Sequence, residues 1–128
     1  MSQKHVLLVE DEPHIAEAIR FILTRAGWQV SLEEDGARAL ARIGAERPDA
    51  VILDLMLPGS SGLEILSALR AGPGGDLPVL MLSARGQGRD REAALAAGAT
   101  AFLAKPFANA AVLSALEEIV ARAEARSA

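Results

Sequence analysis

The chain has 128 residues, of which 51% are apolar, so it can form one domain whose core removes roughly two-thirds of the unfolded surface from water. It contains no cysteine, which excludes disulfides, thiolate nucleophiles and cysteine-ligated zinc and fits a reducing, cytoplasmic compartment. The net charge of −4 leaves no basic surface, and no apolar run is long enough to cross a bilayer. We therefore expect neither direct nucleic-acid binding nor membrane insertion.

Apolar periodicity divides the first half of the chain into alternating strands and helices. Lys4–Val9 is a short apolar run typical of a strand, and His14–Ala26 carries apolar residues at helical spacing. Trp28–Leu32 predicts a second strand. Asp35 then opens a helix that must stop before Pro48.

The second half repeats this order. Ala50–Leu53 is apolar on consecutive residues, as in a strand covered on both faces. Ser60 or Ser61 can cap a helix that ends at the glycine-rich turn Gly72–Gly75. The remaining elements are expected at Leu77–Leu82 and Thr100–Leu103 for strands, and at Asp90–Ala97 and Asn109–Ala123 for helices.

This alternation specifies the fold class. Five strands that alternate with five helices require parallel strands joined by right-handed crossovers. We therefore expect a single α/β domain over residues 1–128, with its core at about residues 4–123.

Polar side chains fall at the ends of four of the predicted strands. Glu10 and Asp11 follow the first strand, and Asp54 follows the third. Ser83 follows the fourth strand and Lys105 the fifth. Because ligands of an open parallel sheet bind beyond the carboxyl ends of its strands, these residues are expected to lie along one rim.

The residue types at this rim favour phosphoryl chemistry on a carboxylate. Clustered acids repel unless a cation lies between them, and Mg²⁺ with its oxygen ligands suits Asp11, Asp54 and a backbone carbonyl of Leu55–Leu57. With no Cys, His or Ser–His pair at the rim, attack by Asp54 on phosphorus is the plausible covalent step. Lys105 and Ser83 would then bind the phosphoryl oxygens.

Four motifs resemble, in order and spacing, those of the receiver domains of two-component response regulators (CheY-like). They are Val9–Pro13, Leu53–Gly59, Leu82–Arg85 and Lys105–Phe107, and the likeness extends from residue 4 to about residue 120. The resemblance implies a flavodoxin-like (βα)5 fold, a doubly wound five-stranded parallel sheet in the order 2-1-3-4-5.

The same resemblance implies roles at the rim. It implies that Asp54 is the phosphoacceptor, that Asp11 binds Mg²⁺ directly and that Glu10 acts on the metal through water. The Met56 carbonyl corresponds to the backbone ligand, and Lys105 to the lysine of the family pattern. The phosphodonor would be a sensor histidine kinase or a phosphotransfer protein.

Further residues are implied to transmit or tune the signal. Ser83 corresponds to the switch hydroxyl, and Phe102 to the aromatic that turns inward when the domain is phosphorylated. Met56, Ala84 and Arg85 flank the site and would tune the lifetime of the phosphoryl group. The surface of the fourth helix, fifth strand and fifth helix would bind a downstream protein effector.

Within this family, the motifs of the chain are most similar to those of the winged-helix transcription-factor class. The chain departs from that class on the surface of the fourth helix, fifth strand and fifth helix. That class carries two acids before the switch aromatic and a charged last helix, whereas this chain has Thr100-Ala101 and a helix beginning Asn109-Ala110-Ala111. A phosphorylation-dependent dimer is an expected state of the class, but its charged contacts are missing here.

Three functions remain as alternatives. The first is a stand-alone receiver that catalyses only its own phosphorylation and dephosphorylation. The second is the receiver portion of a longer transcriptional regulator whose DNA-binding domain lies outside this chain. The third alternative is a small aspartate-based phosphatase. It is disfavoured because such enzymes need a second acid two residues after the nucleophile, where Met56 stands.

Overall fold

The computed structural model describes residues 3–57, 59–73, 75–83 and 88–127, and within them strands and helices alternate as expected. The elements are β1 His5–Val9, α1 Pro13–Arg25, β2 Gln29–Glu33, α2 Gly36–Glu46, β3 Ala50–Asp54, α3 Gly62–Ala71, β4 Val79–Ser83, α4 Gly88–Ala96, β5 Ala101–Ala104 and α5 Asn109–Ser127. All strand pairs are parallel, in the order β2-β1-β3-β4-β5. The predicted doubly wound, flavodoxin-like α/β fold is confirmed.

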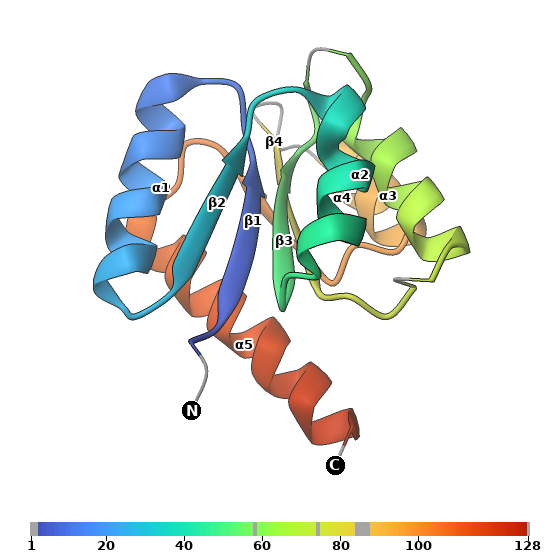
Figure 1. Ribbon diagram of the computed structural model, residues 1–128. Coiled ribbons are helices and arrows are strands. Elements are labelled where there is room, and N and C mark those ends of the chain that lie inside the picture. Colours follow the sequence, from blue (N-terminus) through green and yellow to red (C-terminus); the bar gives the residue numbers. More distant parts are fainter. Residues whose placement is uncertain (1–2, 58, 74, 84–87, 128) are drawn as a thin grey trace.

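The sheet lies between two layers of helices, with α1 and α5 on one face and α2, α3 and α4 on the other (Figure 1). Alternate residues of each strand supply the two cores. Leu8 and Ile52 pack with α1 and α5, while Leu7 and Leu53 pack with the other three helices. Two residues that follow each other along a strand therefore face different helices.

Several element boundaries differ from the sequence-based ranges. β4 begins at Val79 rather than Leu77, because Pro78 has no N–H to donate, although its carbonyl accepts the Val51 N–H at 3.0 Å. β2 lies one residue later than expected, and α4 begins two residues earlier, at Gly88. α5 continues past the expected end to Ser127.

The start of α3 is held by a capping box on Ser61 rather than Ser60. The Ser61 hydroxyl accepts the Glu64 N–H at 3.2 Å, and the Glu64 carboxylate accepts the Ser61 N–H at 3.3 Å. The next residue, Gly62, packs so closely that an added Cβ would lie 2.4 Å from the Asp54 carbonyl oxygen. The helix start therefore supports the backbone at the end of β3.

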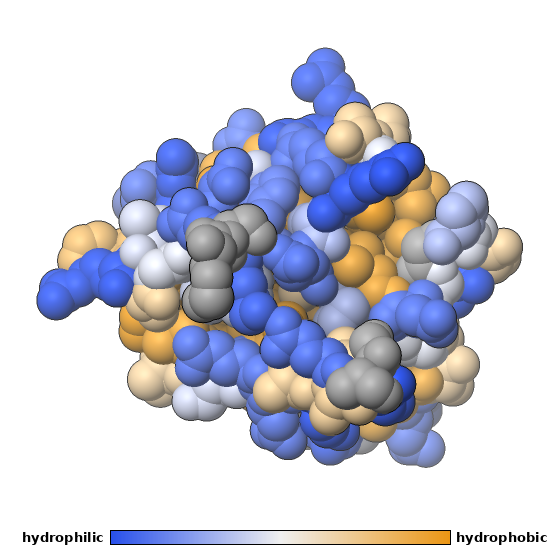
Figure 2. Space-filling model, turned by 60° about the horizontal axis from the view of Figure 1, so that its bottom comes forward, coloured by the Kyte–Doolittle hydropathy of each residue, from blue (hydrophilic) through white to orange (hydrophobic). Residues whose placement is uncertain are grey.

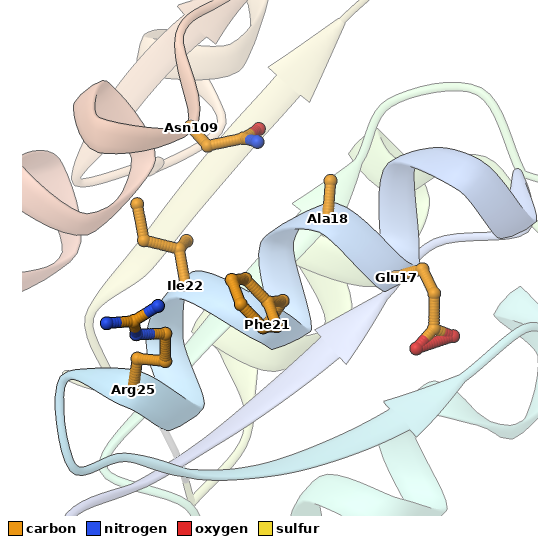
Figure 3. Close-up of a pocket in the computed structure, with 6 residues that line it drawn as sticks. All are labelled: Glu17, Ala18, Phe21, Ile22, Arg25 and Asn109. Carbon is orange, nitrogen blue, oxygen red and sulfur yellow. The ribbon is translucent and has the colours of Figure 1, made fainter.

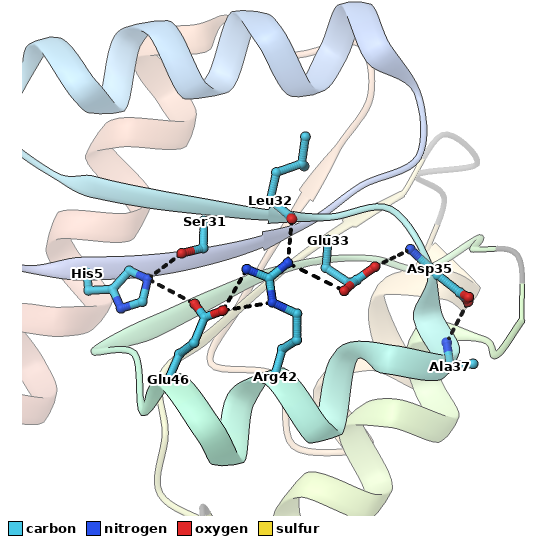
Figure 4. Close-up of polar contacts among 8 residues, drawn as sticks. All are labelled: His5, Ser31, Leu32, Glu33, Asp35, Ala37, Arg42 and Glu46. Atoms are coloured by element: carbon cyan, nitrogen blue, oxygen red, sulfur yellow. Dashed lines mark hydrogen bonds and ion pairs between the residues drawn. The ribbon is translucent and has the colours of Figure 1, made fainter.

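Polar contacts hold α2 against the edge strand β2 (Figure 4). Arg42 donates to the Leu32 carbonyl at 2.6 Å and to the Glu46 carboxylate at 2.7 Å. His5 Nε2 lies 2.8 Å from Ser31 Oγ and 3.3 Å from Glu46 Oε1. These contacts attach the helix to the strands β1 and β2.

Apolar side chains reach the surface at the end of the sheet where its strands begin, as the underside view in Figure 2 shows. A groove of about 610 Å³ lies there between the C-terminal ends of α2 and α3; its apolar lining includes Leu40, Ile43, Leu69, Pro73 and Leu77. No helix in the described residues is both long and apolar enough to span a membrane.

The close approach at Gly62 predicts that Gly62→Ala lowers the free energy of unfolding by about 1–3 kcal/mol, because the backbone atoms that meet the new Cβ cannot move aside cheaply. Gly44→Ala is the matched control, since nothing lies within 4 Å of its added Cβ. It should stabilise α2 by about 0.5–1 kcal/mol. Urea unfolding measures both changes, and equal effects of the two substitutions would contradict the prediction.

Candidate functional site

Three charged side chains from separate strand ends meet at the carboxyl edge of the sheet. Glu10 follows β1, Asp54 ends β3, and Lys105 follows β5. The Lys105 ammonium donates to Asp54 Oδ2 at 2.8 Å and to Glu10 Oε1 at 3.0 Å. One lysine therefore bridges two carboxylates that are distant in sequence.

Burial of this cluster affects the pKa values of Glu10 and Lys105. Glu10 is 0% and Asp54 3% exposed, so their charges have little solvation. Burial, and then the hydrogen-bonded Asp54, raise the pKa of Glu10 to about 7. Burial lowers the pKa of Lys105, but its hydrogen bonds to Asp54 and Glu10 outweigh burial and raise the pKa above its ordinary value. When Glu10 is ionised, the two buried carboxylates carry one negative charge more than the Lys105 ammonium offsets.

Backbone groups fix the orientation of both carboxylates. The Met56 N–H donates to Asp54 Oδ1 at 3.0 Å, and the Glu12 N–H donates to Glu10 Oε2 at 3.1 Å. The side chain of Met56 itself is 53% exposed. The loop after β3 thus positions Asp54 through its main chain, while the assignment of the Met56 carbonyl as a metal ligand stays a prediction.

An acidic group suited to a cation includes the exposed Asp11. Glu10, Asp11 and Asp54 each offer one carboxylate oxygen, and these oxygens lie within 4.8 Å of one another. A hard divalent cation takes such oxygen ligands and would offset the excess negative charge of the two buried acids. The residues present therefore fit the predicted Mg²⁺.

The hydroxyl of Ser83 is turned away from this group. Leu82 pairs with Asp54, so Ser83, the next residue along β4, faces the α2, α3 and α4 side of the sheet. There the Ser83 hydroxyl, which is fully buried, donates to Asp90 Oδ2 at 3.1 Å. The structure thus brings Glu10, Asp11, Asp54 and Lys105 together, but it holds the Ser83 side chain on α4.

Asp90 is a functional candidate that sequence reasoning missed. The sequence analysis used Asp90 only as the expected start of a helix, and the structure places it inside the first turn of α4, which begins at Gly88. The available signal was an acid seven residues after Ser83, at the start of the following helix. A contact between the two depends on how α4 packs on β4, which spacing alone does not specify.

Phe102 lies on the same face as Ser83 and is only 7% exposed. An inward turn on phosphorylation requires an outward starting position, and in this structure the ring is already inward, beside Met81 on β4. Thr100, in the segment where the related class carries acids, accepts the Val79 N–H at 3.0 Å and so serves the fold. The tuning residues Ala84 and Arg85 lie outside the described residues.

A surface groove leads away from the site between α1 and the start of α5. It consists of two adjoining pockets that share Ala18 and Asn109; Lys105 lines one of them, and Phe21 lines the other (Figure 3). Phe21 is 62% exposed, and the Arg25 guanidinium lies 5.5 Å from the centre of its ring. The acidic Glu17 also lines this pocket, so an apolar surface with charged residues of both signs lies along α1.

Comparisons with known proteins agree on one family. The model of the response regulator receiver domain matches residues 6–117. The chain is similar to the response regulator MprA of Mycobacterium tuberculosis, with 44% identity over 120 residues that cover 94% of this chain and 49% of that protein. It is also similar to the probable transcriptional regulatory protein TcrX of the same organism, at 43% identity over 94% of this chain and 48% of that protein.

A solved structure shares the fold and bears on the metal. The receiver domain of a sensor histidine kinase from Pseudomonas aeruginosa, with a magnesium ion coordinated in its active-site cleft, matches with a TM-score of 0.86 and 33% identity. The match covers 94% of this chain and 99% of that one. The chain itself spans about half the length of the two curated relatives it matches.

The acidic group predicts that Mg²⁺ raises the unfolding temperature, because a ligand that binds only the folded state stabilises it. Asp11→Asn should weaken Mg²⁺ binding at least about tenfold, since it removes one of the carboxylates from the group. Thermal unfolding over a Mg²⁺ titration measures both effects. Glu34→Gln, an exposed acid outside the group, is the control and should behave as the unmodified protein; the same loss in both variants would refute the assignment.

Proposed function

The chain belongs to the response regulator receiver domain family of two-component signalling, and from its site we propose that Asp54 accepts a phosphoryl group. The observation that carries the proposal is the buried Asp54 carboxylate held by Lys105 beside Glu10 and Asp11. A nucleophile, an ammonium and an acidic cation site are the groups that phosphorylation of a carboxylate needs.

The proposed reaction transfers phosphorus from a histidine to Asp54. A carboxylate oxygen of Asp54 forms a bond to phosphorus, the bond between phosphorus and the imidazole nitrogen breaks, and that nitrogen keeps the electron pair. Lys105, 2.8 Å from Asp54 Oδ2, offsets negative charge on the phosphoryl oxygens. The Met56 N–H keeps the attacking carboxylate oriented.

Asp11 and Asp54 are proposed to hold Mg²⁺, with the Met56 carbonyl as a further ligand and Glu10 acting through water. The bound ion would neutralise charge that develops on the phosphoryl oxygens. The close oxygens of the acidic group support this assignment, as does the magnesium ion of the related receiver domain.

The proposed phosphodonor is a phosphohistidine on a sensor histidine kinase or a phosphotransfer protein. The groove over Ala18 and Phe21 begins beside Lys105 and offers such a protein a surface next to Asp54. Residues 1–128 are proposed to form one receiver domain that catalyses only its own phosphorylation and dephosphorylation. Its acidic net charge of −4 supports a protein partner over nucleic acid.

The proposed output is a change in the surface of α4, β5 and α5, read by a downstream protein. Phosphorylation adds about −1.5 to −2 charges at Asp54 and creates acceptors for Ser83 and Lys105. Ser83 and Phe102 are the proposed switch residues, and Met56, Ala84 and Arg85 the proposed tuning residues. A phosphorylation-dependent dimer is a further proposed state, to be measured by molecular size.

A second candidate is the receiver portion of a longer transcriptional regulator. The observation in its favour is that the chain spans about half the length of MprA and TcrX. Sequencing the gene beyond Ala128 distinguishes this candidate from a stand-alone receiver, since only the longer protein continues into an output domain.

Acetyl phosphate with Mg²⁺ should add the mass of one phosphoryl group to the protein, and chelation of Mg²⁺ should prevent the addition. Asp54→Asn should abolish the labelling, because the amide is a far weaker nucleophile than the carboxylate. Asp76→Asn, at an exposed aspartate, should label like the unmodified protein. Intact-protein mass spectrometry reads all three, and labelling retained in Asp54→Asn would sink the proposal.

A further inference from the structure

We propose that Asp90 is a positioning residue that holds the Ser83 hydroxyl on α4 and thereby opposes the phosphorylated state. This inference rests on the proposed phosphorylation of Asp54 and names a regulator of that same site. Its basis is the 3.1 Å hydrogen bond from the Ser83 hydroxyl to Asp90 Oδ2.

The sheet separates Ser83 from Asp54 even though the two residues end neighbouring strands. Asp54 pairs with Leu82, whose side chain packs with the α1 and α5 face, so Ser83 points to the opposite face. To reach a phosphoryl group on Asp54, the hydroxyl must rotate around the end of β4. It must therefore leave Asp90.

The backbone of Ser83 itself is held in the sheet, so we expect the side chain to be the part that rotates. Ser83 pairs with Ala104 in the parallel ladder, and its carbonyl accepts the Lys105 N–H at 2.7 Å. The main chain is therefore anchored to the strand that carries the site lysine. Exchange of the hydroxyl between two acceptors changes the side chain while β4 stays in register.

A hydroxyl carries one proton, so it can donate one hydrogen bond at a time. The Asp90 carboxylate and the phosphoryl oxygens are both anionic acceptors, and bonds to such acceptors are the stronger kind. Asp90 and a phosphoryl group on Asp54 thus compete for the same donor. Each acceptor must weaken the hydrogen bond of Ser83 to the other, because the coupling between two ligands of one group is reciprocal.

Release of Asp90 would act on a helix that is weakly attached. Among the described residues of α4, Ala94 is the one that is fully buried, and the bond from Ser83 ties the first turn of the helix to the end of β4. Phe102 is already buried in this structure. The first turn of α4 is therefore expected to respond together with the proposed switch residue Phe102.

The test measures how tightly beryllofluoride, a phosphoryl mimic, binds in the presence of Mg²⁺. Asp90→Ala should bind it about tenfold more tightly than the unmodified protein, because Ser83 no longer has to leave a charged acceptor. Asp90→Asn, which keeps the size of the side chain but not its charge, should show a smaller gain. This second variant also serves if Asp90→Ala fails to fold.

The decisive comparison repeats the measurement with Ser83→Ala. If Asp90 acts through the hydroxyl, Asp90→Ala changes nothing in that background, whereas a merely structural effect on α4 would persist. Glu92→Ala removes another acid of α4 with an exposed side chain and should leave affinity unchanged. A gain that persists without Ser83, an equal gain in Glu92→Ala, or no gain in either Asp90 variant overturns the inference while the proposed function stands. Failure of the unmodified protein and every variant to bind beryllofluoride overturns both.

Discussion

The arrangement at the carboxyl edge depends on one ammonium held between two buried carboxylates. Lys105 follows the last strand, yet it reaches Asp54 and Glu10, which end two other strands of the sheet. Removing a partner from a buried ion pair leaves an uncompensated charge, which is strongly destabilising. The three strand ends must therefore stay in register, and the acidic group beside them fits the proposed cation.

The pleat of the sheet places the proposed phosphoacceptor and the proposed switch residues on opposite faces. Asp54 pairs with Leu82 and so lies on the α1 and α5 side, where Lys105 binds it, whereas Ser83 and Phe102 lie on the side of α2, α3 and α4. Neighbouring residues of one strand point in opposite directions. In the proposed mechanism, the Ser83 side chain at the end of β4 links the two faces.

The two helices that adjoin the ends of β3 and β4 are held in different ways. α3 begins with a capping box at Ser61 and packs Gly62 directly on the backbone of Asp54. α4 buries only Ala94 among its described residues. Regions with few buried contacts open most easily. The domain thus combines a firmly supported acidic site with a helix, α4, that buries little of its surface.

The sequence by itself determined the element order, the parallel sheet and the convergence of Glu10, Asp11, Asp54 and Lys105. It could do so because apolar periodicity is local and because the carboxyl ends of parallel strands share one edge. It left open whether Ser60 or Ser61 caps α3. The tertiary structure alone decided that cap, the bond from Ser83 to Asp90 and the inward ring of Phe102. These depend on the direction of each side chain against a neighbouring element, which strand register and helix packing set together.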